Sequence, residues 1–389
     1  MISIDELLHF EELLTDEQKL IRDSVKQFVS DKFSPHIENH FNNETFPEEL
    51  IPDIAQLGLL GAGIQGYGCA GLDAVSYGLV LQELEYGDSG LRSFVSVQGS
   101  LAMHAIATFG SEEQKQKWLP DMAAGKMIAC FGLTEPDAGS DPGAMRCRAT
   151  KIDGGYLLNG SKMWITSSPI SNVCVVWAKC EGDDAKDIRG FIVESHLKGV
   201  STPRTKNKFS LRASHTGEII MDNVEIPENC LLPKSHGLGS PLNCLNAARF
   251  GISWGVIGAA RSCFDTALGY SKSRISFGVP IAKKQFVQEK LVTMATEIVK
   301  AQLMCFHYSK IKDKNKLSPY MVSLCKRNNV SMALNIARES RNILGANGIM
   351  PEYPIIRHML NLESVFTYEG THDVHTLILG RGLTDEDAF

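Results

Sequence analysis

The spacing of apolar residues changes twice along the chain. Up to about residue 125 they recur every three or four positions, which predicts amphipathic helices, and Thr15 with Gln18 has the pattern of a helix capping box. From about residue 126 to 235, short runs rich in β-branched and aromatic residues alternate with Gly, Asn, Asp and Ser, which predicts strands. From about residue 236 the helical spacing returns, and one long helix is expected from about Pro319 to Leu344.

This order predicts an α+β multidomain protein. It consists of an N-terminal helical domain (1–125), a central antiparallel β domain (126–235) and a C-terminal helical bundle (236–389). Because no helical pattern separates the strand-like runs, we expect an antiparallel barrel or sandwich rather than βαβ units.

Composition and charge exclude several classes of protein. With 39 basic and 45 acidic residues the net charge is −6, so there is no basic excess for binding nucleic acid. No apolar run reaches the roughly 18 residues of a membrane helix, so no membrane insertion is expected. The ten cysteines form no CxxC pair and are expected to be reduced. The first residues resemble neither a secretory signal nor a transit peptide, which favours a bacterial cytoplasm or a processed mitochondrial matrix protein.

Three motif-like segments do not support the chemistry that they suggest. Residues Gly61 to Gly66 fit GxGxxG, but a helical pattern precedes them where a dinucleotide-binding turn needs a strand. The segment Gly155 to Lys162 has Ser and Lys in the wrong order for a phosphate-binding loop, and Asn159-Gly160 within it is typical of a turn. His372 and His375 have no third metal ligand nearby, and Thr371 before them is expected to cap a helix.

Two other segments together suit a planar cofactor. FGLTEPDAGSD, beginning at Phe131, follows a predicted strand with small and hydrogen-bonding residues, and Trp164-Ile165-Thr166 lies on a later strand. These segments offer backbone donors, hydroxyl groups and one large flat aromatic ring.

Four motifs, in order, resemble the acyl-CoA dehydrogenase family. They are FGLTEPDAGSD, WIT, NILGANG from Asn342 and YEGT from Tyr368, and the resemblance runs from about Thr15 to Phe389. The stretches KFSLRASHTGEIIMDNVEIPE, CLNAARFGISWGV and NLESVFTYEGTHDVHTLILGR resemble the glutaryl-CoA dehydrogenase branch in particular. The resemblance implies two helical domains around a central β domain, the last one a four-helix bundle, assembled as a homotetramer that binds FAD.

The resemblance also implies which residues contact FAD. Residues from Phe131 to Ser140 would hold the flavin ring, with Trp164 packing on it. Arg274, Gln285 and residues 342–346 would bind the rest of the dinucleotide, partly from a neighbouring subunit. The implied contacts are Phe131, Gly132, Leu133, Thr134, Glu135, Pro136, Asp137, Ala138, Gly139, Ser140, Trp164, Ile165, Thr166, Arg274, Gln285, Asn342, Ile343, Leu344, Gly345, Ala346, Thr371 and Phe389.

For the substrate, the resemblance makes Glu369 the catalytic base. Arg92 and the two serines of RSxxS would receive the distal carboxylate of the acyl chain, with Glu85 and Tyr368 beside them, and the start of a later helix would line the CoA channel. The implied substrate contacts are Glu85, Arg92, Ser93, Ser96, Ser140, Leu242, Asn243, Cys244, Leu245, Asn246, Ala247, Ala248, Arg249, Tyr368 and Gly370. The alternative for Arg92 is a surface charge paired with Asp88 at i,i+4 spacing.

The implied activity is FAD-dependent oxidative decarboxylation of glutaryl-CoA to crotonyl-CoA and CO2, with electrons passing to an electron-transfer flavoprotein. Lysine and tryptophan degradation are compatible pathways. Within the same class, the alternatives are a glutaryl-CoA dehydrogenase that does not decarboxylate and a dehydrogenase of another short-chain acyl-CoA. Alternatives from other classes are a catalytically silent acyl-CoA-binding protein and, more remotely, a nicotinamide dehydrogenase.

Overall fold

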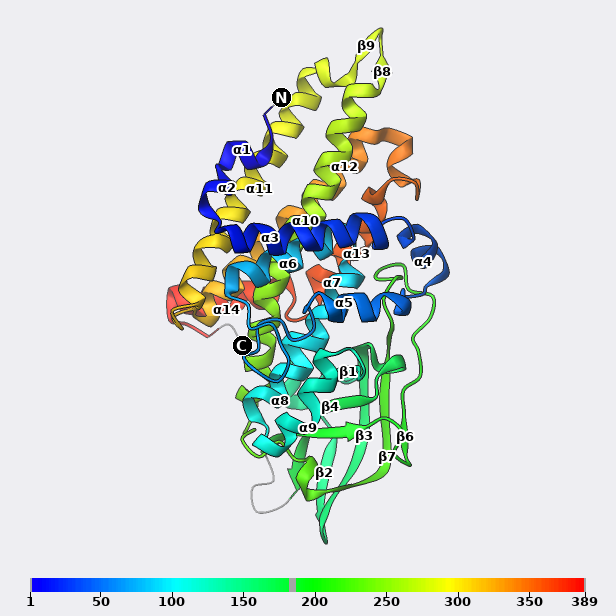
Figure 1. The fold of residues 1–389 in the computed structure, drawn as a ribbon, viewed down its shortest axis with the longest axis vertical. Coiled ribbons are helices and arrows are strands. Elements are labelled where there is room, and N and C mark those ends of the chain that lie inside the picture. Colours follow the sequence, from blue (N-terminus) through cyan, green and yellow to red (C-terminus); the bar gives the residue numbers. More distant parts are fainter. Residues whose placement is uncertain (1, 182–186, 388–389) are drawn as a thin grey trace.

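A computed structural model describes residues 2–181 and 187–387 of the chain (Figure 1). The N-terminal helices are α1 (Ile4–Leu8), α2 (Phe10–Leu13), α3 (Asp16–Phe28), α4 (Ile37–Asn43), α5 (Ile51–Gln56), α6 (Ala74–Gly87), α7 (Ser89–Ser96), α8 (His104–Phe109) and α9 (Glu112–Ala123). The C-terminal helices are α10 (Gly239–Ser273), α11 (Gln285–Lys312), α12 (Pro319–Leu344), α13 (Pro354–Thr367) and α14 (His372–Thr384). This alternation of helical, β and helical parts confirms the predicted fold class.

Local signals in the sequence explain several helix boundaries. The Thr15 side chain accepts from the backbone N–H of Gln18, and the Gln18 side chain accepts from the N–H of Thr15, as a capping box requires. Thr371 caps α14 in the same way by accepting from Val374. Helix α12 has the bounds expected from its apolar spacing. The turns from Gly61 to Gly66 connect α5 to α6, so the GxGxxG segment is a loop between helices.

The strands form one mixed sheet and a small hairpin. The sheet contains β1 (Ala129–Gly132), β2 (Arg148–Ile152), β3 (Gly155–Thr166), β4 (Val173–Glu181), β5 (Ile188–Glu194), β6 (Val200–Ser201) and β7 (Thr216–Pro227), and the hairpin contains β8 (Ile275–Ser276) and β9 (Val279–Pro280). The pairs β2–β3, β3–β7, β4–β5 and β6–β7 are antiparallel, as expected. Strand β4, however, lies parallel to both β1 and β2.

The parallel pairs arise because β1 and β2 share one edge of β4. Strand β1 pairs with Val173–Val176 at the start of β4, and β2 pairs with residues 179–181 at its end. Residues 133–147 therefore leave the sheet after β1 and return to the same edge as β2. This excursion carries the predicted flavin loop outside the sheet while both of its ends stay anchored.

One expected turn is wrong. Asn159 and Gly160 lie inside β3, where the register against β7 shifts between Leu158 and Gly160, so they form a β-bulge rather than a turn. A Cβ on Gly160 would lie 2.8 Å from the Cα of Cys147, so the close approach of that backbone requires glycine.

Helix α10 is the central element of the helical half. It packs against α6 on one side and α12 on another, and its buried residues join those of α11, α12 and α13 in one apolar core. Two further cores lie beneath α3–α7 and between the sheet and α8–α9, and a fourth lies within the β domain. All ten cysteines are free thiols, as expected. Among the described residues, no helix is long and apolar enough to span a membrane.

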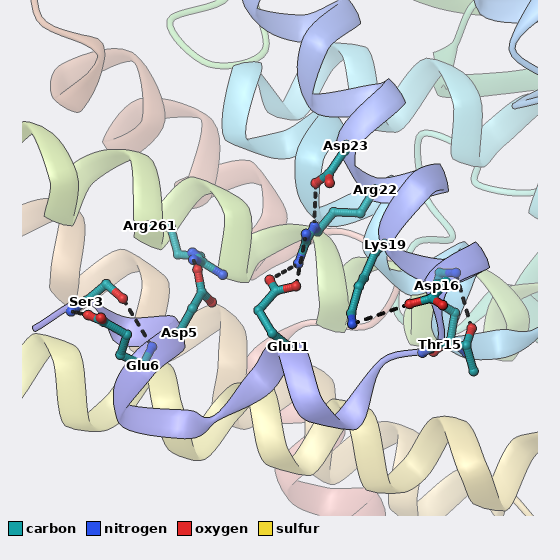
Figure 2. A network of polar contacts seen from close by, with 11 residues as sticks. Ser3, Asp5, Glu6, Glu11, Thr15, Asp16, Lys19, Arg22, Asp23 and Arg261 are labelled. Carbon is teal, nitrogen blue, oxygen red and sulfur yellow. Dashed lines mark hydrogen bonds and ion pairs between the residues drawn. The ribbon is translucent and has the colours of Figure 1, made fainter.

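The N-terminal segment is held against the helices by charged pairs as well as by apolar contacts (Figure 2). Ile4, Phe10 and Leu14 are buried in the core around α10. Asp5 pairs with Arg261 of α10 at 2.5 Å, and Glu11 pairs with Arg22 of α3. The segment therefore lies against α3, α10 and α11.

Candidate active site

Glu369 lies in the short connection between α13 and α14. Its φ of 52° is in the left-handed region, which non-glycine residues rarely occupy, and Gly370 follows with a φ of 90°. A Cβ on Gly370 would lie 2.8 Å from Nε2 of His375, so this position is also closed to larger residues. The backbone conformation is thus unusual at the residue implied to be the catalytic base, as is common at functional sites.

The electrostatic environment of Glu369 suits a base. Its Oε2 atom is buried and has no hydrogen-bond partner among the described residues. Burial raises the pKa of this carboxyl, while the positive charges of Arg92, Arg249 and Lys326 partly oppose the rise. A carboxylate that is desolvated and unpaired is basic enough to remove a weakly acidic proton.

Arg92 is buried beside this carboxylate and is not a surface charge. Only 1% of its surface is exposed; its Nε donates to Oε2 of Glu85 at 2.6 Å, and its Nη2 donates to the Tyr368 hydroxyl. The expected alternative, pairing with Asp88, is wrong because Asp88 instead accepts from Arg357 at 2.6 Å. The structure therefore brings Glu85, Arg92 and Tyr368 into one buried polar group.

Two hydroxyl groups next to Arg92 lack partners. The Oγ atoms of Ser93 and Ser96 are buried, and neither has a hydrogen-bond partner in the described part of the chain. The Oγ of Ser89 donates to Glu85 at 2.8 Å, which satisfies the second oxygen of that carboxylate. Burial raises the pKa of Tyr368 to about 12, so its phenol stays protonated and available as a donor. Unsatisfied buried hydroxyls beside a guanidinium are available to hydrogen-bond a polar ligand group.

The implied CoA-channel residues occupy the first turns of α10. Cys244 and Ala248 are buried, Asn243 is exposed, and the remaining residues from Leu242 to Ala247 are half-buried. The buried Arg249 points toward the base, because its Nε donates to the Glu369 carbonyl at 2.7 Å. Ser140 and Gly370 of the same set lie on the loop after β1 and beside Glu369, respectively. These positions stay predictions for CoA contact.

The implied flavin loop is folded by one internal carboxylate. Glu135 accepts from the N–H groups of Arg146 and Cys147 and from the buried Lys162 Nζ at 2.8 Å. Its side chain is thus used to close the loop, and its backbone N–H and C=O pair with those of Ala138. Phe131, Leu133 and Ala138 face the core, while Thr134 is half-buried and Pro136, Asp137, Gly139 and Ser140 are exposed.

Trp164 presents a flat apolar surface next to this loop. The β3–β7 register shifts between Lys162 and Ile165, and at this bulge Trp164 has a φ of 63° and 56% of its surface exposed. Bulges of this kind re-aim a side chain. The Met163 N–H donates to the Thr134 carbonyl at 2.9 Å, which holds the loop beside the strand. An exposed indole beside the half-buried hydroxyls of Thr134 and Thr166 fits a flat ring that carries hydrogen-bonding groups, such as the flavin of FAD.

The other implied FAD residues lie elsewhere in the chain. Arg274 follows α10 at the β8–β9 hairpin, and its carbonyl accepts from Ile281 in the segment before Gln285. Asn347, just after residues 342–346, donates to the hydroxyl of Tyr270 near the end of α10. In Figure 1 this hairpin end of the molecule is opposite to the sheet. A single chain therefore does not bring Arg274 and Gln285 close to the flavin loop and Trp164. Phe389 lies outside the described residues.

Two functional candidates were missed by the sequence interpretation. Gly255 of α10 faces the polar group, since a Cβ there would lie 2.1 Å from Oε2 of Glu85. Lys326 of α12 is buried, and its Nζ donates to the carbonyls of Tyr368 and Gly370. A glycine and a lysine in otherwise helical segments carry no local signal of such a position, which is set by packing of α10 against α6 and of α12 beneath the Glu369 turn.

Comparisons with known proteins agree with this architecture. The chain matches the models of the acyl-CoA dehydrogenase N-terminal domain over residues 15–126, the middle domain over 130–224 and the C-terminal domain over 235–384. A crystal structure of glutaryl-CoA dehydrogenase from Mycobacterium smegmatis is 50% identical, with a TM-score of 0.97 and 100% of both chains covered. A glutaryl-CoA dehydrogenase structure from the same organism, in complex with FADH2, is 48% identical, with a TM-score of 0.98 and the same coverage.

A relative named only as an acyl-CoA dehydrogenase shows a likeness over almost the whole chain as well. An acyl-CoA dehydrogenase of Bacillus subtilis is 34% identical over 373 residues, which make up 95% of this chain and 98% of the relative. With its three domains matched in order and its loop and indole suited to a flavin, this chain belongs to the acyl-CoA dehydrogenase family and is an FAD-dependent acyl-CoA dehydrogenase.

Proposed function

We propose that this enzyme oxidises glutaryl-CoA and then releases the distal carboxylate as CO2, giving crotonyl-CoA, with an electron-transfer flavoprotein as electron acceptor. The observation that carries the proposal is the buried Arg92. Its ion pair with Glu85 holds it near Glu369, where its positive charge lowers the pKa of the Glu369 carboxyl. The glutaryl-CoA dehydrogenase of M. smegmatis, at 50% identity over the full chain, supports the same substrate.

The charges of the site favour an acyl chain that carries an anion. Arg92, Arg249 and Lys326 act on the Glu369 carboxyl, and Glu85 is the counter-ion of Arg92. With Lys326 protonated, cationic groups exceed carboxylates before the substrate enters. An apolar acyl chain leaves this excess unbalanced, whereas the terminal carboxylate of a glutaryl group meets a guanidinium and the free hydroxyls of Ser93 and Ser96.

The chemistry assigned to the chain is proton transfer and charge stabilisation. Glu369 removes the α-proton of the thioester, and the bound FAD supplies the acceptor for the β-hydride. The backbone N–H of Glu369 stabilises the negative charge that develops on the thioester oxygen. After oxidation, loss of CO2 leaves a dienolate, and the proton held by Glu369 returns to its terminal carbon to give the crotonyl group.

A product assay tests the proposal. Purified enzyme is incubated with glutaryl-CoA and an artificial electron acceptor, and acyl-CoA products and CO2 are identified by mass. Crotonyl-CoA with CO2 is expected. Glutaconyl-CoA alone would limit the reaction to oxidation, and oxidation of butyryl-CoA without turnover of glutaryl-CoA would overturn the substrate assignment.

The role of Arg92 is tested separately. We expect Arg92→Met to lower kcat/KM for glutaryl-CoA by about 100-fold, the effect of losing charge-assisted hydrogen bonds worth about 3 kcal/mol, and to change kcat/KM for butyryl-CoA far less. Because the single change leaves Glu85 buried without its partner, the double variant Glu85→Gln/Arg92→Met is the matched control for folding. An unchanged preference for glutaryl-CoA in both variants would contradict the assignment.

A further inference from the structure

Lys326 is a buried cation whose contacts are all directed at the turn that carries Glu369. It lies on α12, 1% of its surface is exposed, and its Nζ donates to the carbonyl of Tyr368 at 2.8 Å and to that of Gly370 at 2.7 Å. These are the residues immediately before and after Glu369. Among the described residues, no ion pair joins Lys326 to the Glu369 carboxylate itself, so the lysine holds the backbone and leaves the base free.

Three consecutive carbonyl groups of this turn are each bound by a cationic side chain. Lys326 donates to the carbonyls of Tyr368 and Gly370, and Arg249 donates to the carbonyl of Glu369 at 2.7 Å. Charge-assisted hydrogen bonds of this kind are stronger than neutral ones. They hold a backbone that is otherwise unfavourable, since Glu369 is a non-glycine residue with a φ of 52°.

The direction of one peptide group follows from these bonds. The described chain contains no cis peptide bond, and in a trans peptide the C=O and the following N–H point in opposite directions. Because the Tyr368 carbonyl points at Lys326, the N–H of Glu369 points away from it. In the described part of the chain this N–H has no hydrogen-bond acceptor, so it is a free donor beside the base.

We propose that Lys326 is a positioning residue for the reaction: it clamps the Tyr368–Gly370 turn so that the Glu369 carboxylate and the Glu369 N–H both face the thioester. The inference rests on the proposed function, in which Glu369 is the base. Burial is the largest influence on the pKa of Lys326; Glu369 opposes it, Arg249 and Arg92 reinforce it, and the pKa falls to about 7. The amine therefore occupies this site without a carboxylate of its own and remains a donor in either protonation state.

The central test is Lys326→Met, which keeps the length of the side chain and removes its donors. We expect kcat to fall by about 100-fold, the effect of misplacing catalytic groups by about 1 Å, while KM changes little because the acyl and CoA contacts remain. In a crystal structure of the variant, the φ of Glu369 is expected to leave the left-handed region. That readout does not depend on activity.

Asn329→Ala is the matched control. Asn329 is buried one turn further along α12, and its side chain donates to the carbonyl of Ser253 at 2.9 Å, so it is also a buried donor to backbone. We expect this variant to lower the melting temperature and to keep kcat within about twofold of wild type, because loss of a buried hydrogen bond alone affects stability. If both variants lower kcat equally, Lys326 acts through general stability and the proposal is overturned.

Two further variants make the outcomes distinguishable. If Lys326→Met does not fold, Lys326→Gln retains one shorter donor that cannot reach both carbonyls, and the same loss of kcat at constant KM is expected. Wild-type kcat in whichever of the two variants folds would overturn the proposal. Glu369→Gln is assayed in parallel: activity in that variant would overturn the base assignment itself, whereas an inactive Glu369→Gln with a fully active Lys326→Met would overturn only the role of Lys326.

Discussion

At the scale of single residues, Glu369 is the group in which the opposing influences of the site meet. Burial favours its neutral form, and Arg92, Arg249 and Lys326 favour its ionised form, with burial the larger effect. The carboxyl is therefore more basic than an exposed one, yet three cations keep it ionisable. This balance suits a base that removes an α-proton and later returns a proton.

Replacing this carboxylate tests the balance most directly. We expect Glu369→Gln to lower kcat by about 100- to 10,000-fold, the usual contribution of a positioned general base, with retention of the flavin. The rate is measured as reduction of an artificial acceptor at saturating acyl-CoA. The matched control is Glu363→Gln on α13, because Glu363 is exposed and pairs with the surface Arg338. A loss smaller than tenfold at position 369 would contradict its role.

The raised pKa predicts the pH dependence of the reaction. Protonated Glu369 accepts no proton, so kcat/KM falls as the pH drops through the pKa of this carboxyl, and that limb lies above the ordinary value of 4.5. Because Arg92 lowers the pKa of Glu369, Arg92→Met is expected to move the limb to higher pH. The profile is measured with butyryl-CoA, whose chain carries no carboxylate to titrate. A limb that stays in place would show that Arg92 does not act on the base.

The sequence indicates the candidate residues Arg92 and Glu369 better than Lys326 and Gly255, which pack around them. The motifs around Arg92 and Glu369 are contiguous, and residues 88–92 do not have the amphipathic pattern of a surface helix. Lys326 and Gly255 come from the middle of long helices, where each reads as an ordinary helical position. Their roles depend on which face of α12 and α10 meets the site, and that is decided by tertiary packing.

At the scale of elements, α10 serves both the predicted CoA channel and the buried Glu85–Arg92 pair, whose two residues lie on α6 and α7. The helix is long enough to carry the channel residues in its first turns and Gly255 beneath Glu85 further on. Sequence spacing predicts helices such as α3 and α12, because each has an apolar stripe. It does not predict that β1 and β2 share an edge of β4, since that arrangement depends on a pairing between strands separated along the chain.

Two glycines of α10 give opposite predictions for the same substitution. At Gly255 a new methyl group would lie 2.1 Å from Oε2 of Glu85 and 3.2 Å from Nε of Arg92, so Gly255→Ala is expected to displace the pair and to destabilise the fold by about 1–3 kcal/mol. At Gly269 an added Cβ would have no atom of the described residues within 4 Å, apart from its chain neighbours and the helix's own backbone. Gly269→Ala is therefore expected to stabilise the helix by up to about 1 kcal/mol.

Denaturant unfolding measures both free energies, and the ratio of kcat/KM for glutaryl-CoA to that for butyryl-CoA measures the effect on the site. Only Gly255→Ala is expected to lower that ratio. If both alanines stabilise the fold and leave the ratio unchanged, the contact between α10 and the Glu85–Arg92 pair does not control substrate choice.

At the scale of the whole molecule, the implied FAD residues fall into two groups that one chain keeps apart. The loop after β1 and Trp164 belong to the β domain, whereas Arg274 and Gln285 flank the hairpin at the opposite end (Figure 1). Phe277 in the hairpin turn and Phe286 at the start of α11 are also exposed, with 95% and 85% of their surfaces accessible. An exposed apolar tip beside unused cofactor residues favours an assembly in which one chain completes the site of another.

This arrangement predicts complementation between two defective chains. In a two-fold pair, each site takes its base and flavin loop from one chain and its hairpin residues from the other. A chain with Glu369→Gln spoils the site it houses, and a chain with Arg274→Asp spoils the site of its partner. A mixed pair therefore contains one doubly defective site and one intact site. When the variants are co-expressed with different affinity tags, each alone should be inactive, and random pairing should restore about a quarter of the sites to wild-type activity. Because sites built entirely within one chain cannot be rescued in this way, an inactive mixture that nevertheless contains both tagged chains would refute the shared site.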